Sequence, residues 1–300
     1  MNIAVVLTCY NRKDKTIECL KSLFDYSKKN SFSKIEINVY LTDDGCTDGT
    51  SEAVKNMFPH ENITILKGNG SLFWAGGMRL AWNTAIQDDK NYDYYLLVND
   101  DAKMLPNCFD QLFDAVKFGQ NKYGKKPLVS GIMKQSADHE EETYGGKLWK
   151  NKFLGTGIHL KPNGIPQSCD MAHANILLVP SSAVDEIGIF CEDYVHGGAD
   201  HDYTLLANKR GIPVLVTAEF CGICENDHRK KSERPLFVAS LPYHERKAYF
   251  NNPRHSIHDH LVYVRRNTPW RLPLVYAGYL LTLYIPQFYL LLNKLRHLKG

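Results

Sequence analysis

The sequence lacks the compositional biases that mark the special classes of protein. It has no internal repeat and no low-complexity stretch, and its formal net charge is only +3 over 300 residues. A hydrophobic content of 44% and a charged content of 23% exclude a disordered chain, a collagen and a polytopic membrane protein. Its eight cysteines are scattered, which argues against a disulfide-stapled miniature. With no signal peptide at its start, we expect a cytosolic protein with reduced thiols.

The small net charge conceals an uneven distribution along the chain. Residues 229–300 hold 13 Lys and Arg against three Asp and Glu, whereas residues 1–228 hold 23 against 30. Such a division predicts an acidic catalytic domain at 1–228 and a basic extension at 229–300 that meets an anionic partner. A membrane surface, a nucleic acid and an anionic substrate would each suit that charge.

Apolar segments with strand and helix patterns alternate over the first half of the chain. Strands are predicted at 3–7, 35–41, 63–66, 92–98 and 127–132, and helices at 16–23, 47–57, 76–86 and 110–118. This alternation predicts an α/β fold with a mostly parallel sheet. Ligands of such sheets bind at the carboxyl ends of the strands.

Carboxylates gather where the ligand of such a sheet would lie. Asp43 and Asp44 follow the second predicted strand, and Asp100 and Asp101 follow the fourth. Hard oxygen ligands of this kind suit a divalent cation beside substrate phosphates, although turns and helix caps would explain them equally well. Asp200 opens a later helical pattern, where it would either cap the helix or accept a proton as a general base.

Taken in order, these segments resemble the family 2 glycosyltransferases, inverting enzymes of the GT-A fold. The matching motifs are Val5–Arg12, Thr42–Thr50, Gly70–Gly77, Val98–Ala102, Ala199–Tyr203 and Gly211–Val214. The resemblance covers about residues 1–230, and the loop at 72–77 resembles the bacterial rhamnosyltransferase-like branch. It implies a GT-A domain whose mostly parallel central sheet is flanked by helices.

The resemblance also implies roles for individual residues. Asp200 would be the catalytic base, and Asp101, with His228, would hold Mg²⁺ or Mn²⁺. The nucleotide-sugar donor would be bound by Thr8, Tyr10, Asn11, Arg12, Asp43, Asp44, Trp74, Gly77, Arg79 and Asp100. Three of these residues have an open alternative: Trp74 as a core side chain, Arg79 on a solvated helix face and His228 as a structural histidine. The chain departs from the family at Ala199, where an acidic residue is usual, and at Asn99, which starts the metal motif.

The basic extension contains an uncharged run from Leu272 to Asn293. It is long enough to span a bilayer, which takes about 20 residues. Pro273, Pro286 and several tyrosines favour a helical segment lying in the interface, so that residues 254–300 would contact the membrane surface. The alternative is a helical hairpin that packs on the catalytic domain or forms a homodimer.

These features together predict a metal-dependent inverting glycosyltransferase bound peripherally to the inner face of the cell membrane. It would move a sugar, rhamnose from dTDP-rhamnose or the sugar of another nucleotide donor, onto a lipid-linked saccharide acceptor. A sugar-phosphate nucleotidyltransferase is an alternative, but the segment after the first strand lacks the Gly-rich basic loop that it needs. A nucleic-acid-binding protein is another alternative; the tyrosines of the extension lie in an uncharged run, so we expect no nucleic acid partner.

Overall fold

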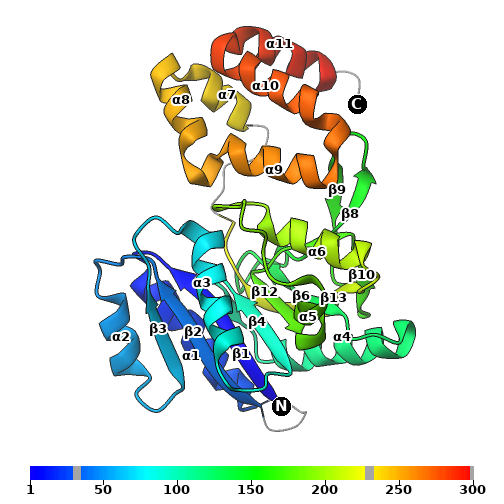
Figure 1. Cartoon of the computed structure of the whole chain (residues 1–300). Coiled ribbons are helices and arrows are strands. Elements are labelled where there is room, and N and C mark those ends of the chain that lie inside the picture. The colour runs from blue at the N-terminus through cyan, green and yellow to red at the C-terminus, as the bar shows by residue number, and fades with distance from the viewer. Residues whose placement is uncertain (30–34, 227–232, 298–300) are drawn as a thin grey trace.

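The computed structural model describes residues 1–29, 35–226 and 233–297. Its centre is a sheet with the strand order β10-β13-β6-β12-β4-β1-β2-β3, in which β5 pairs with β13 and β7 with β6 (Figure 1). The strands are β1 (Asn2–Cys9), β2 (Glu36–Asp43), β3 (Ile63–Lys67), β4 (Tyr94–Val98), β5 (Lys103–Met104), β6 (Leu128–Lys134), β7 (Glu142–Tyr144), β10 (Gln167–Ser168), β12 (Ile176–Pro180) and β13 (Val214–Ile223).

The sheet is parallel on one side and mixed on the other. Neighbours β4, β1, β2 and β3 are all parallel, as their alternation with helices predicted. Strand β12 runs antiparallel to both β4 and β6. It enters the sheet after a small second sheet of β8 (Gly146–Asn151), β9 (Thr156–His159) and β11 (Met171–Ala172), which reverses the chain. The predicted α/β fold with a central sheet is confirmed.

Helices cover both faces of the central sheet, and β1 shows why. Its residues alternate between two cores: Val5 packs with α1, α2 and α4, and Val6 with α3, α5 and α6. A strand buried on both faces reads as a continuous apolar run, as this one does. The helices are α1 (Lys13–Ser27), α2 (Thr50–Met57), α3 (Phe73–Gln87), α4 (Cys108–Tyr123), α5 (Ser181–Ile187) and α6 (Ala199–Lys209).

The extension forms a separate layer of helices beyond the sheet (Figure 1). It consists of α7 (Glu233–Ser240), α8 (Tyr243–Asn251), α9 (Ile257–Asn267), α10 (Leu272–Tyr284) and α11 (Pro286–His297), with short 3₁₀ turns η1 (Pro253–His255) and η2 (Pro269–Arg271). Helix α9 lies nearest to the catalytic domain and contacts α6, while α10 and α11 pack against each other.

The uncharged run is therefore a helical hairpin rather than one continuous helix. It breaks at Ile285, because Pro286 has no backbone N–H and starts a new helix. Within residues 1–29, 35–226 and 233–297, no helix is long and apolar enough to cross a membrane. The shape agrees with the hairpin alternative, and contact with a membrane surface stays a prediction.

Helix α3 approaches the sheet closely at Gly77. The Oγ1 atom of Thr42 on β2 donates a hydrogen bond of 2.8 Å to the Gly77 carbonyl. On the other side, a Cβ atom at Gly77 would lie 2.8 Å from the Cβ of Thr8 on β1. A glycine is needed here for packing, and this contact sets the position of the helix over the carboxyl ends of the strands.

Replacing Gly77 by alanine tests this close contact. The added methyl group would overlap Thr8, and overpacking of this kind costs about 1–3 kcal/mol. We expect the free energy of unfolding in urea to fall by about that amount. Gly278→Ala in α10 is the matched control, because the nearest atom to its Cβ would be 4.0 Å away. A Gly77→Ala protein as stable as the control would contradict the packing role.

Candidate active site

The three predicted polar clusters meet at one edge of the sheet. Strands β4, β1 and β2 are adjacent and parallel, so their carboxyl ends place residues 99–101, 8–12 and 42–44 side by side. Asn11 links two of these loops, since its Oδ1 accepts a hydrogen bond of 2.7 Å from the backbone N–H of Thr47. Its φ of 51° lies in the left-handed region, which asparagine tolerates better than most residues. Tyr10 beside it is 47% exposed at the mouth of the site.

Arg12 binds both carboxylates of the predicted metal motif. Its guanidinium donates to Asp100 Oδ1 at 3.0 Å and to Asp101 Oδ2 at 2.7 Å. Burial raises the pKa of Asp100 to about 7; the positive charge of Arg12 opposes this rise and the neighbouring Asp101 adds to it. The side chain of Arg12 is 38% exposed, compared with 7% for Asp100 and 17% for Asp101, so this cation is the most accessible of the three groups.

The two aspartates fit a divalent cation by the chemistry of their donors. The Oδ2 atom of Asp100 is buried without a hydrogen-bond partner, and Asp101 retains 17% side-chain exposure. No group of three His, Cys, Asp or Glu side chains in the described parts of the chain could hold a metal by itself. Mg²⁺ in particular is usually held by one or two carboxylates together with substrate phosphates, which matches this site. The predicted ligand His228 lies outside the described residues.

Asp44 serves as an anchor for the loop that leads into α3. Its carboxylate is only 3% exposed and accepts hydrogen bonds from the backbone N–H groups of Gly70 (2.9 Å), Leu72 (3.3 Å) and Phe73 (3.0 Å). An aspartate directly after β2 thus caps a helix that begins 29 residues later. These bonds occupy both oxygens, and the predicted contact of Asp44 with a nucleotide base stays a prediction.

Asp43 turns its carboxylate toward the following loop. It accepts hydrogen bonds from the backbone N–H of Cys46 at 2.6 Å and from the hydroxyl of Ser51. Burial alone would raise the pKa of Asp43, but the hydrogen bonds outweigh it and hold the pKa below its usual value. The carboxylate is therefore ionised and only half-buried, which leaves it able to accept a further donor.

The structure shows what Trp74 and Arg79 on α3 contact. The indole N–H of Trp74 donates to Asn99 Oδ1 at 2.8 Å, so this half-buried ring joins α3 to the aspartate motif. Arg79 donates to the carbonyl oxygens of Cys191 (3.1 Å) and Tyr194 (2.8 Å). Arg79 thus supports the loop before Asp200 rather than standing on a solvated face. Donor contacts by either side chain stay predictions.

Asp200 occupies the first turn of α6, after a tight turn at Gly198 with φ of 88°. Its half-buried carboxylate accepts hydrogen bonds from the N–H of His201 (2.8 Å) and of Ala174 (3.3 Å). His173 lies beneath, with its ring 4.5 Å from that of His201. Burial lowers the pKa of His173 well below its usual value, and His201 adds to that effect.

The structure brings a residue to this site that sequence reasoning missed. Asp259 of α9 is 4% exposed and accepts hydrogen bonds from the backbone N–H groups of Val195 (3.2 Å), His196 (2.7 Å) and Gly197 (2.9 Å). In the sequence it stands among three histidines, within a segment that reads as a solvated helix. One signal was present: Asp259 is the only acidic residue after Glu245.

A second contact joins α9 to the helix that carries Asp200. Asp202 is buried and accepts hydrogen bonds from Arg266 Nε at 2.9 Å and Asn267 Nδ2 at 2.6 Å. Asp202 is therefore a structural support of α6, and its partners are consecutive residues of α9. Helix α9 therefore contacts the chain on either side of Asp200, at residues 195–197 before it and at Asp202 after it.

Replacing Asp259 by alanine removes the acceptor for three backbone N–H groups at once. We expect the free energy of unfolding to fall by about 1–3 kcal/mol, and amide hydrogen exchange to quicken most at residues 195–197. Asp193→Ala is the control, because its exposed ion pair with Arg265 at 2.8 Å should contribute less than about 1 kcal/mol. Unchanged exchange at 195–197 in the Asp259 variant would contradict the anchoring role.

Comparison with known proteins identifies the fold and the family. The model of the family "Glycosyl transferase family 2" matches residues 4–157. The mannosyltransferase PcManGT from Pyrobaculum calidifontis, solved with GDP-Man and Mn²⁺, is similar with a TM-score of 0.51 and 17% identity over 99% of this chain and 80% of that one. TarS 1-349 from S. aureus, solved with UDP-GlcNAc, has a TM-score of 0.54 and 14% identity over 94% and 82%. No curated protein sequence matches significantly.

The solved structures are too distant in sequence to show more than the shared GT-A fold. The family match covers just over half of the chain and includes Arg12, Asp44, Asp100 and Asp101. Asp200 and the C-terminal helices lie outside it, so their roles depend on the geometry described above. The chain belongs to glycosyl transferase family 2 and is a sugar-transferring enzyme.

Proposed function

We propose that the protein transfers a sugar from a nucleotide donor to an acceptor hydroxyl with inversion at the anomeric carbon. The observation that carries this proposal is the placement of Asp200 at a helix start, with its carboxylate held by two backbone N–H groups. Among the alternatives, the family match favours sugar transfer over nucleotidyl transfer and over nucleic acid binding.

The proposed reaction is a single in-line displacement. The carboxylate of Asp200 accepts the proton of the acceptor hydroxyl while the acceptor oxygen forms a bond to the anomeric carbon. The bond between that carbon and the donor phosphate oxygen breaks on the opposite face, and its electron pair leaves with the nucleoside diphosphate. Attack from the opposite face inverts the configuration.

Negative charge grows on the departing diphosphate, and the site offers positive charge to meet it. Arg12 stands at the mouth of the aspartate pair with its side chain partly exposed, where it can donate to phosphate oxygens. Mg²⁺ or Mn²⁺ held by Asp101 and Asp100 would supply further charge neutralisation. PcManGT was solved with Mn²⁺, which supports a divalent cation here.

We propose dTDP-rhamnose as the first donor to test, because the loop at 72–77 resembles that of rhamnosyltransferases. Trp74 at this loop lies beside the aspartate motif through its bond to Asn99. The two similar structures were solved with other nucleotide sugars, PcManGT with GDP-Man and TarS with UDP-GlcNAc. A screen of dTDP-, UDP- and GDP-sugars for thermal stabilisation and hydrolysis would identify the donor of this enzyme.

Replacing Asp200 by asparagine tests the base. We expect transfer to fall about 10²–10⁴-fold, the usual contribution of a general base, with nucleotide affinity nearly unchanged. Asp101→Ala is the comparison variant, since it should instead weaken metal-dependent nucleotide binding. Both are measured by nucleotide-sugar turnover and by calorimetric titration of the nucleotide. Substantial transfer by Asp200→Asn would remove this residue from the mechanism.

We also propose that the enzyme works at the inner membrane face on a lipid-linked acceptor. Large apolar side chains are exposed on the α10–α11 hairpin, including Leu274 at 72%, Ile285 at 54% and Leu291 at 53%. The extension that carries them is strongly basic, and basic residues near apolar ones favour an anionic lipid surface. Peripheral membrane association follows from these two properties together.

Vesicle flotation tests this surface directly. We expect the protein to float with phosphatidylcholine vesicles that contain phosphatidylglycerol. The double variant Phe288→Glu and Leu291→Glu should bind at least about tenfold more weakly, because each buried apolar side chain contributes about 1.5–3 kcal/mol. Met57→Glu is the matched control, since Met57 is 59% exposed on α2. A wild-type protein that stays in the unbound fraction would count against membrane association.

A further inference from the structure

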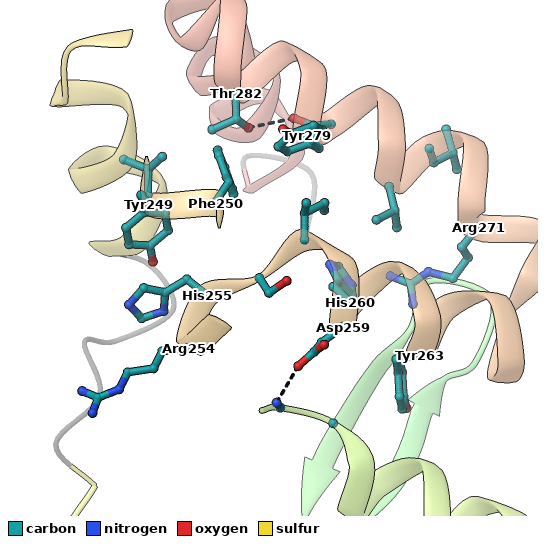
Figure 2. Close-up of a pocket in the computed structure, with 18 of the residues that line it drawn as sticks. Tyr249, Phe250, Arg254, His255, Asp259, His260, Tyr263, Arg271, Tyr279 and Thr282 are labelled. Atoms are coloured by element: carbon teal, nitrogen blue, oxygen red, sulfur yellow. Dashed lines mark hydrogen bonds between the residues drawn. The ribbon is translucent and has the colours of Figure 1, made fainter. Parts of the chain in front are cut away.

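A cavity of about 750 Å³ lies between the loop before Asp200 and the C-terminal helices. Its floor is formed by Gly197 and Gly198, and its walls and roof come from η1, α9 and α10 (Figure 2). Sites for small molecules commonly enclose about 300–1,000 Å³, so this space suits a ligand of that size. The cavity belongs to the extension rather than to the donor cleft, since none of the predicted donor residues lines it.

Most of the cavity surface is aromatic or aliphatic. The rings of Phe250 and Tyr279 meet edge to face at 5.0 Å, and those of Tyr249 and His255 stack at 4.4 Å. Apolar side chains continue this surface along the roof and at the tip of the β8–β9 hairpin, and they are Leu274, Val275, Phe153 and Leu154. Such a lining favours the apolar part of a ligand.

The arginines and the aspartate of the lining differ in whether they have partners within the protein. Arg254 and Arg271 both line the cavity, and neither forms an ion pair with a carboxylate among the residues that the structure describes. In Figure 2 the side chain of Arg271 lies beside His260, whereas that of Arg254 extends away from it. The acidic residue of the lining, Asp259, is already occupied by three backbone N–H groups. The lining therefore includes two arginines for which the described part of the chain supplies no carboxylate partner.

Arg271 lies beside His260 in the cavity (Figure 2). Its guanidinium lies against Gly155 of the β8–β9 hairpin, where an added Cβ atom would be 2.7 Å from one of its terminal nitrogens. Burial lowers the pKa of His260, and the charge of Arg271 lowers it further. A neutral imidazole beside a guanidinium forms a site that can hydrogen-bond a phosphate group, which Arg binds with two parallel bonds.

We propose that this cavity is the acceptor site, and that it takes an amphiphile whose phosphate or diphosphate group lies against Arg271 and His260 while its apolar chain follows α10. The inference rests on the proposed function and names the acceptor class for it. Its support is the lack of a carboxylate partner for the arginines, the apolar roof, and the direct contact of the cavity with the loop that leads to Asp200.

Binding of a labelled prenyl diphosphate to the full-length protein tests the proposal. Farnesyl diphosphate is the probe, titrated with saturating dTDP, UDP or GDP, whichever stabilises the protein most, so that the donor cleft is filled. We expect binding to persist under these conditions. We expect Arg271→Ala to weaken it about 10–100-fold, the range for losing hydrogen bonds to a charged group.

Further variants and competing ligands make the result specific. Arg210→Ala, an exposed arginine at the end of α6, should leave the affinity unchanged, and Arg271→Lys should recover part of it. Inorganic pyrophosphate and farnesol should each bind more weakly than farnesyl diphosphate. Thermal stabilisation of Arg271→Ala by the nucleotide should equal that of the wild type, which shows that the variant is folded.

Each contrary outcome has a distinct meaning. Displacement of the probe by the nucleotide, or equal affinity in Arg271→Ala, would overturn the proposed acceptor site. Equal binding of pyrophosphate or of farnesol would overturn the amphiphile. Failure of the proposed function is recognised separately, because the wild type would then hydrolyse no nucleotide sugar whether or not it bound the probe.

Discussion

The carboxylate of Asp259 is the contact on which the active-site arrangement depends. It accepts three backbone hydrogen bonds from residues 195–197, the segment that leads into the helix of Asp200. Without an acceptor, these N–H groups would have to find water or rearrange, and an unmade hydrogen bond is costly. Asp202 binds the other end of α9 through Arg266 and Asn267. The extension is thus a structural part of the catalytic loop as well as a neighbour of it.

Asp44 plays a similar part among the residues predicted to bind the donor. Asp44 accepts three backbone N–H groups from the loop before α3, so a single carboxylate again fixes a segment distant in sequence. The neighbouring pair Asp100 and Asp101 carries its charge at a partly buried position, and Arg12 compensates it. These carboxylates therefore have two different roles. Asp44 organises the backbone, whereas Asp100 and Asp101 are the proposed ligands of a cation beside the donor phosphates.

The extension joins three features that belong together in an enzyme acting on an amphiphilic acceptor. Its hairpin exposes apolar side chains, its cavity combines an apolar roof with arginines that lack carboxylate partners, and α9 supports the loop of the base. An acceptor bound in that cavity would reach the catalytic loop from the side of the extension, opposite to the nucleotide. This division would let donor and acceptor bind independently, since no predicted donor residue lines the cavity.

Over the first half of the chain, the sequence by itself determined the alternation of strands and helices, the parallel part of the central sheet, and the polar clusters at the ends of β1, β2 and β4. These follow from local periodicity and from the rule that parallel strands share an edge. It did not reveal that Arg79 supports a loop or that Asp259 anchors another, and it left the hairpin at 272–293 as an alternative to a helical segment in the membrane interface. Those outcomes depend on hydrogen bonds such as that of Asp259 to His196, across 63 residues of chain. Only the tertiary structure could decide them, since local patterns carry no information on which distant backbone groups a buried carboxylate will meet.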